Sequence, residues 1–313
     1  MFDLFGNQID PAKAINVNIY ADEIWEVENI YSKEKWIYSA AIYEIASKPI
    51  LDDLMDSRYC KEKENWENYK DKNDIDIHWA EIYNNRNMKF IVERWLKYVY
   101  DDCFKDRRFQ FSLMGINLTN LNTKEFDNKQ NFNSIYNRFF RSMLKYSLKK
   151  FFGSGVVVDH IYHEEGSQQN HDYFDWHTIF KLDQDEKLKF NTEKIEFLPK
   201  SHKRDNRSNI IQLCDMLAGI IKDLHLGIIE SNKNKNKREI LCSPIVKNLI
   251  MDRIIRKPKN TNSSYGYVNR FHLSFFPKIR SDPGSINRSM DNYYDASKIE
   301  LAFEYNPNQA HLF

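Results

Sequence analysis

The helix expected from residue 209 to about residue 226 constrains the fold more than any other segment, because its residues 209–221 are apolar on nearly every side. Such a helix has to be buried in a core. Its polar residues Gln212 and Asp215 are three apart and lie on one face, and Gly219 continues that line. The glycine costs about 1 kcal/mol of helix propensity relative to alanine, which is tolerable where another group approaches the backbone closely. A lone buried aspartate costs several kcal/mol unless it is paired or binds a metal, so Asp215 is either functional or a structural acid bonded to a buried Lys, Arg or Tyr.

Two expected strands each end on a carboxylate. Residues 17–23 alternate with period two and finish on Asp22 and Glu23, while residues 156–160 run through three valines to Asp159. A carboxylate at the end of a buried strand is costly to desolvate unless a cation or a proton meets it. For the first strand alone, the alternative is a solvated Asp-Glu turn. The repeat of the pattern favours acids that converge at one edge of a sheet.

The remaining pattern is that of an α/β protein. Further strands are expected over residues 36–43, 109–118, 194–198 and 265–276, and further helices over residues 50–55, 88–103, 133–152 and 172–182. The strand over residues 36–43 should pair with the first strand as a hairpin, and Ser208 should cap the buried helix. We predict one domain over residues 1–230 with a charged insertion at 59–75, followed by a C-terminal α+β extension over 231–313.

Composition and charge exclude several classes. The 313 residues are 42% hydrophobic and 29% charged, which is globular, and Lys+Arg 46 against Asp+Glu 45 does not mark a nucleic-acid binder by bulk charge. The cysteines have no metal-binding spacing and are expected to be reduced core residues of a cytoplasmic protein: Cys60, Cys103, Cys214 and Cys242. A signal peptide and a membrane-spanning run are not expected.

These motifs resemble one known family. Asp22 with Glu23, His78 with Glu81, Asp159, and the run over residues 212–219 follow in the order and spacing of the widespread prokaryotic domain of unknown function 3800. The similarity covers roughly residues 16–226, and the last motif is its most specific part. It departs from the family pattern at Ile24, where serine is usual, and at Cys214, where alanine is usual. The resemblance implies a ribonuclease H-like fold, with a mixed sheet flanked by helices and acids from two strands and a late helix meeting at one edge.

Acids that meet in this way favour a metal-dependent mechanism. Converging carboxylates repel one another unless cations neutralise them, and all-oxygen ligation suits Mg²⁺ or Mn²⁺. Two such ions roughly 4 Å apart activate a water and stabilise the leaving oxygen of a phosphodiester. We expect Asp22, Asp159 and Asp215 as the ligand core and Glu81 as a fourth ligand. Glu23 points to the opposite side of an ideal strand, which leaves its role less defined.

Proton transfer and substrate contacts have their own candidates. His78 or His160 is expected to shuttle protons to the leaving group, since histidine titrates near neutral pH; the alternative for each is a structural histidine. Local positive charge at residues 200–204 and 253–259 suits nucleic acid, either DNA or RNA. Aromatic residues near the second segment either stack bases or form strand core: Tyr265, Tyr267, Phe271 and Phe275.

Two other interpretations remain open beside that of a metal-dependent nuclease of a mobile-element or phage-defence system. The first is a zinc site in a run of histidines and glutamates that lacks the order of known zinc motifs: His160, His163, Glu164, Glu165, His171 and His177. The second is a catalytically inactive nucleic-acid or protein-binding module that keeps the fold. A complete set of acids favours the enzyme.

Overall fold

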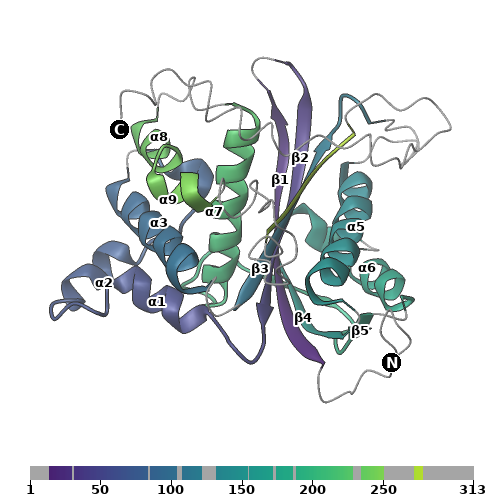
Figure 1. Cartoon of the computed structure of the whole chain (residues 1–313), viewed down its shortest axis with the longest axis horizontal. Coiled ribbons are helices and arrows are strands. Elements are labelled where there is room, and N and C mark those ends of the chain that lie inside the picture. Colours follow the sequence, from purple (N-terminus) through teal and green to yellow (C-terminus); the bar gives the residue numbers. More distant parts are fainter. Residues whose placement is uncertain are drawn as a thin grey trace, which may run out of the picture.

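The computed structural model describes residues 14–29, 32–83, 85–103, 108–121, 132–153, 155–171, 174–185, 188–227, 234–249 and 271–277. Within these ranges seven strands form one mixed sheet with helices on both of its faces, so the predicted α/β class is confirmed (Figure 1). No helix of the described part is long and apolar enough to cross a membrane.

The sheet is built around the expected hairpin. β1 (Ile15–Glu28) pairs antiparallel with β2 (Lys35–Ile45), and β2 pairs antiparallel with β3 (Phe109–Asn117), whereas β4 (Val156–Glu164) pairs in parallel with β1. Three shorter strands complete it: β5 (Leu188–Phe190) and β6 (Ile195–Leu198) beside β4, and β7 (Phe271–Phe276) beside β3. The order is β5-β4-β1-β2-β3-β7, which leaves β1 and β2 at the centre.

The helices divide between the two faces (Figure 1). One face carries α1 (Leu51–Tyr59), α2 (Glu67–Asn73), the 3-10 turn η2 (Trp79–Glu81), α3 (Arg86–Tyr98), α7 (Ser208–His225), α8 (Lys235–Leu241) and α9 (Pro244–Lys247). The other face carries α5 (Phe132–Phe152) and α6 (Phe174–Asp183). α7 is buried along nearly its whole length, as its composition requires.

The period-two pattern of β1 separates the two cores. Val17, Ile19 and Ala21 lie in the core beneath α5 and α6, whereas Tyr20 lies in the core beneath α7. Asp22 has the same parity as Tyr20 and therefore faces α7. The alternation thus decides which face of the sheet receives the first carboxylate.

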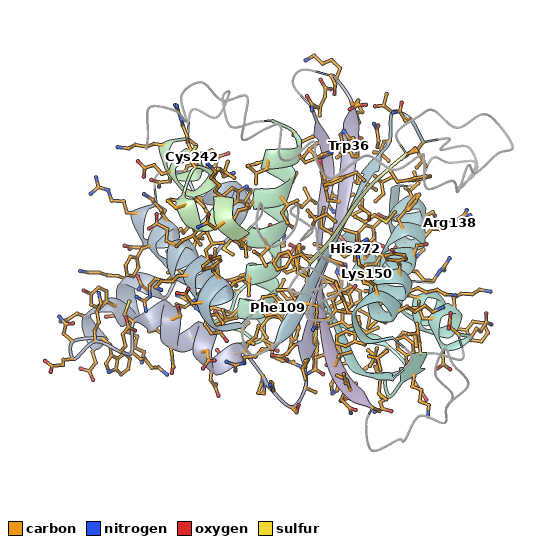
Figure 2. The ribbon with its side chains drawn as sticks, viewed as in Figure 1. Trp36, Phe109, Arg138, Lys150, Cys242 and His272 are labelled. Carbon is orange, nitrogen blue, oxygen red and sulfur yellow. The ribbon has the colours of Figure 1, made fainter. Side chains whose placement is uncertain are left out.

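The C-terminal extension shares this sheet and core. β7 pairs with β3, and residues of α8 and α9 lie in the core beneath α7. On the other face, His272 of β7 lies beside Lys150 and Tyr146 of α5 (Figure 2). Residues 253–259, Tyr265 and Tyr267, which carried the predicted nucleic-acid contacts of the tail, lie outside the described residues.

Smaller predictions have mixed outcomes. The helix expected over residues 133–152 is confirmed as α5, and Cys60, Cys214 and Cys242 are buried and form no disulfide among the described residues. The prediction that Ser208 caps α7 is wrong, because its hydroxyl donates to the carbonyl of Pro199 at 2.6 Å, outside the helix. The strand at residues 188–190 was not expected, since three residues are too short to show a period.

Candidate acidic site

The first acid of the site is Asp22, which lies in the middle of β1 rather than at its end. β1 continues to Glu28, and Ile24 pairs with Tyr38 of β2 beyond the acid. The apolar pattern continues through Ile24 and Val27, which pack against the core beneath α7 and prolong the hairpin. Asp22 is only 3% exposed, so its carboxyl is enclosed by the protein.

The acid that β4 supplies is Glu164, not Asp159. β4 runs on past the expected end, and its register with β1 places His163 opposite Ala21, so Glu164 lies level with Asp22. Asp159 is five residues earlier, about 16 Å along the strand. There its carboxylate accepts hydrogen bonds from the side-chain amides of Asn16 and Asn191 at 2.7–3.0 Å. The expected convergence of Asp159 with Asp22 and Asp215 is therefore corrected.

The third acid, Asp215, comes from α7, which packs across β1 and β2. Its Oδ2 accepts the main-chain N–H of Trp79 at 2.8 Å and lies 4.0 Å from Nδ1 of His78. The Asp215 side chain is 19% exposed and that of His78 is 21% exposed. The structure therefore brings together two predicted acids and one predicted histidine. We call Asp22, Glu164 and Asp215 the acidic cluster.

The polar line on α7 holds the segment before η2. Gln212 Oε1 accepts the N–H of Ile77 at 3.1 Å and an N–H of Arg58 at 2.7 Å. Its amide nitrogen donates to Asp76 at 3.0 Å and to the carbonyl of Lys200 at 2.9 Å. Gln212 thereby ties α1, the segment leading to His78 and the loop after β6 to the helix that carries Asp215.

Gly219 follows Gln212 and Asp215 along the same face of α7. The indole of Trp79 packs directly on the helix at this glycine. A Cβ at Gly219 would meet the Trp79 ring at 2.2 Å, which no real side chain tolerates. The Trp79 ring N–H donates to Asp223 one turn further along at 2.8 Å. The expectation that a group approaches the helix backbone at this glycine is confirmed.

Burial and mutual repulsion dominate the electrostatics of the cluster. The pKa of Asp22 is raised well above its usual value, first by burial and then by the charges of Glu164 and Asp215. Burial also raises the pKa values of Glu164 and Asp215, although Lys200 opposes this for Glu164 and the Trp79 N–H opposes it for Asp215. The Lys200 ammonium lies 3.1 Å from Oε2 of Glu164. Three carboxyls in this position favour protonation or a cation.

The donor set fits a hard cation in kind, since it consists of carboxylate oxygens. However, among the described residues no group of three or more His, Cys, Asp or Glu side chains is arranged to hold a metal ion together. The chemistry of the donors therefore suits Mg²⁺ or Mn²⁺, while a ready-made coordination shell is not present in that part of the chain.

Glu23 faces the opposite side of the sheet, as strand alternation predicts. Its carboxyl lies 3.4 Å from Nε2 of His163, whose other ring nitrogen lies 2.9 Å from the carbonyl of Glu164. The Tyr136 hydroxyl lies 2.8 Å from the same Nε2. Burial lowers the pKa of His163 to about 4, so this imidazole is neutral near pH 7. These side chains form a buried network behind the acidic cluster.

Two further predicted residues lie apart from the cluster. Glu81 is exposed on η2, and the contacts of this segment with Asp215 come from His78 and Trp79 instead. His160 is exposed four residues before Glu164, with its Nδ1 3.2 Å from Glu196. Of the two histidines considered for proton transfer, the structure places His78 beside the acids.

The zinc alternative is not supported by the geometry. His163 packs among Phe140 and Phe174 beneath α5 and α6, whereas His160 stacks on Tyr162, which faces α7. The two histidines thus project from opposite faces of β4 and cannot share one ion. The side chain of His177, also part of that run, lies outside the described residues.

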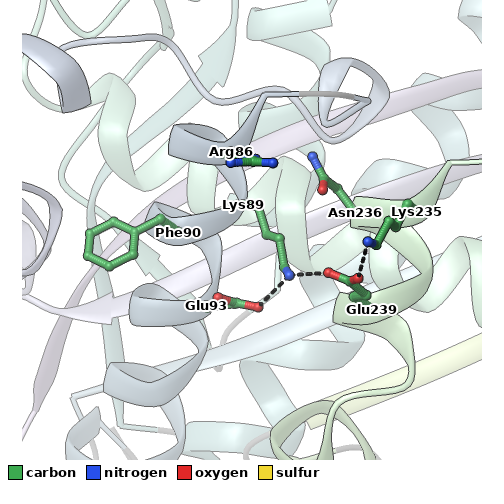
Figure 3. A pocket seen from close by; sticks show the side chains of 7 residues that line it. All are labelled: Arg86, Lys89, Phe90, Glu93, Lys235, Asn236 and Glu239. Carbon is green, nitrogen blue, oxygen red and sulfur yellow. Dashed lines mark hydrogen bonds and ion pairs between the residues drawn. The ribbon is translucent and has the colours of Figure 1, made fainter. Parts of the chain in front are cut away.

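A pocket of about 500 Å³ lies between α3 and α8 and shares no lining residue with the acidic cluster (Figure 3). Lys89 contacts both Glu93 and Glu239, and Lys235 lies 3.8 Å from Glu239. These ion pairs offset most of the positive charge that Arg86 and the lysines bring. The pocket is therefore a weaker candidate for the functional site than the acidic cluster.

Sequence reasoning named Glu164 only in the zinc alternative and Lys200 only in the basic loop over residues 200–204, and it did not place either residue beside Asp22 and Asp215. The signal for Glu164 was present, because period-two alternation continues through Ile161, Tyr162 and His163 to the acid. Lys200 lies in a loop, and its contact with Glu164 depends on how that loop is anchored, which no local pattern encodes.

No model of a known protein family matches the chain, and no curated protein matches it. The resemblance described from the motifs therefore stays a prediction.

Proposed function

We propose that the protein is a metal-dependent phosphodiester hydrolase, a nuclease, whose acidic cluster holds Mg²⁺ or Mn²⁺. The observation that carries the proposal is the burial of Asp22, Glu164 and Asp215 together, which raises the pKa of each acid. Such an arrangement is costly for folding alone and is characteristic of sites that bind cations. The acids come from two strands and a late helix, as expected for a ribonuclease H-like site.

In this proposal Asp22, Glu164 and Asp215 are the ligands, with Glu164 in place of Asp159. The bound ion would polarise the phosphodiester and lower the pKa of an attacking water. His78, 4.0 Å from Asp215, is placed to give a proton to the leaving oxygen. Gln212 and the Trp79 N–H hold the segment that carries this histidine in position.

The test is incubation of the purified protein with labelled DNA and RNA in Mn²⁺, Mg²⁺ or EDTA. We expect cleavage with either metal and none in EDTA. Glu164→Gln should reduce the rate at least 100-fold, while the matched change Asp159→Asn on the same strand should leave it within about threefold. The opposite ranking of the two variants would refute the assignment of the cluster.

A second candidate function is a non-catalytic binding module with the same fold. It is favoured by the contacts of α7, because Gln212 and Asp215 already serve to anchor the segment around Ile77 and Trp79. Absence of cleavage of every substrate in both metals, together with retained binding of an oligonucleotide by wild type and Glu164→Gln alike, would establish this alternative.

A further inference from the structure

The pocket between α3 and α8 is a second concave site, and one side of α3 forms its wall (Figure 3). Arg86, Lys89, Phe90 and Glu93 recur at intervals of three and four residues, so they share that side of the helix. The opposite side of α3 packs in the core beneath α7. The volume of the pocket is about 500 Å³, within the ~300–1,000 Å³ range of small-molecule sites.

Arg86 gives this pocket its net charge. The two lysines and the two glutamates of the lining form ion pairs with one another, so these four groups are neutral together. Arg86 is exposed, and its side chain makes no hydrogen bond or ion pair with the residues that the structure describes. A guanidinium donates through five N–H groups and accepts none. One positive charge in the pocket is therefore open to an anionic ligand.

Asn236 of α8 adds a second donor. Its side-chain Nδ2 is buried and has no hydrogen-bond acceptor within the described part of the chain. A buried N–H without an acceptor destabilises a protein, so such groups are rare in folded chains unless another molecule satisfies them. Figure 3 shows the Asn236 amide on the same side of the pocket as the Arg86 guanidinium, with its nitrogen turned toward that group. Donors from two helices thus face a space that lacks an acceptor.

Phe90 supplies an apolar wall to the same pocket. The ring is half-buried and stacks on Tyr69 of α2, with 6.4 Å between the ring centroids and 16° between the ring planes. An aromatic ring held in this way offers a rigid surface to a planar group of a ligand.

We propose that the pocket between α3 and α8 binds a nucleoside monophosphate, with its phosphate on Arg86 and Asn236 and its base against Phe90. The guanidinium fork takes two phosphate oxygens, and the Asn236 amide takes the third oxygen that a terminal phosphate has and a carboxylate lacks. The same chemistry is presented by a free nucleotide and by the 5′-phosphorylated end of a nucleic-acid strand. The inference does not depend on the proposed nuclease activity, because the pocket shares no lining residue with the acidic cluster.

The test is calorimetric titration of the full chain in EDTA, so that no divalent cation contributes to binding. The ligands are adenosine monophosphate, adenosine and inorganic phosphate. We expect saturable one-to-one binding of adenosine monophosphate with a dissociation constant below about 1 mM. Adenosine and inorganic phosphate should each bind at least about tenfold more weakly, because the first lacks the oxyanion and the second lacks the ring.

Three variants locate the binding site. Arg86→Gln removes the open charge and should weaken binding of adenosine monophosphate at least about tenfold. Asn236→Asp places a carboxylate where the phosphate is expected and should abolish binding; Asn236→Ala, which removes the donor without adding charge, serves as the second variant and should weaken binding about three- to tenfold. Lys97→Gln is the matched control, because Lys97 also lies on α3, is 69% exposed, pairs with Asp101 and does not line the pocket.

Competition distinguishes the two sources of the phosphate. Displacement of adenosine monophosphate by a 5′-phosphorylated oligonucleotide, but not by its 5′-hydroxyl counterpart, identifies the end of a strand as the ligand. Binding of adenosine monophosphate without such displacement identifies a free nucleotide. The inference is overturned if wild type does not bind adenosine monophosphate, if wild type binds adenosine equally well, or if Arg86→Gln binds the nucleotide as tightly as Lys97→Gln does. None of these three results bears on cleavage by the acidic cluster.

Discussion

Gly219 offers the sharpest test of how α7 positions the site. In Gly219→Ala the new Cβ would lie 2.2 Å from two atoms of the Trp79 ring and 2.6 Å from its Cβ. Trp79 is 2% exposed and is held at both ends, by the Asp215 carboxylate at its main-chain N–H and by Asp223 at its ring N–H. The tryptophan therefore cannot move aside without breaking one of these hydrogen bonds.

The expected magnitude follows from three opposing terms. Alanine stabilises the helix by about 1 kcal/mol relative to glycine. Overpacking against the Trp79 ring costs about 1–3 kcal/mol, and loss of one hydrogen bond to a charged acceptor costs about 1.5–3 kcal/mol. The net change for Gly219→Ala is a destabilisation of about 1.5–5 kcal/mol, with loss of the Trp79 contact that orients Asp215.

The assay is urea unfolding of Gly219→Ala, Trp79→Gly and the double variant. Glycine at residue 79 removes both the indole and the Cβ that lies 2.6 Å from the new methyl group, so Gly219→Ala in the Trp79→Gly background should be neutral or stabilising by up to about 1 kcal/mol. The coupling energy of the cycle should reach about 1.5–6 kcal/mol. A single variant Gly219→Ala as stable as wild type would refute the close packing of Trp79 on α7.

Three further predictions address charge. Asp215→Asn keeps an oxygen to accept the Trp79 N–H but removes one repelling charge. Its melting temperature without metal should equal or exceed that of wild type, and most of the Mn²⁺-induced rise in melting temperature should be lost. A loss of about 3–5 kcal/mol in the free energy of unfolding would instead indicate a structural acid. Burial, then Lys150, lowers the pKa of His272 to about 3. Between pH 6.5 and pH 4 the unfolded chain therefore binds more protons than the folded chain, and the free energy of unfolding of wild type should fall by about 3 kcal/mol. The fall should be smaller in His272→Phe, and the exposed His160→Phe is the control. Arg58→Met removes the buried cation beside Asp76 and should cost about 3 kcal/mol or more in thermal or urea unfolding; a cost below 1 kcal/mol would contradict its role.

Much of the framework is readable from the sequence because each element has a strong period. The alternation of β1 fixes the face that receives Asp22, and the apolar circumference of α7 requires the helix to be buried against the sheet. Together these two facts place Asp22 and Asp215 in the same layer. They do not depend on loop lengths or on the tail.

The alternation that leads to Glu164 does not show where β4 ends or how β4 is aligned with β1. The register of β4 with β1 shifts between the pairs Val17–Val158 and Asn18–His160, so one residue is inserted and side-chain parity changes within the strand. An apolar run followed by Asp159 indicates a strand end, whereas hydrogen bonding to β1 carries β4 on to Glu164. A bulge of this kind is set by the neighbouring strand and leaves no local signature.

Asp22 and Glu164 indicate a functional site more strongly than the motif of α7 does. Anchoring of the segment before η2 explains Gln212 and would explain Asp215, since an asparagine would accept the Trp79 N–H equally well. No such contact requires a buried carboxyl at the end of β4 or in the middle of β1, where Asp22 faces both other acids. A sequence selected only for stability would replace these two acids by neutral residues, because three clustered carboxyls oppose folding. The presence of these acids therefore conflicts with what stability alone favours, and such conflicts are expected at functional sites.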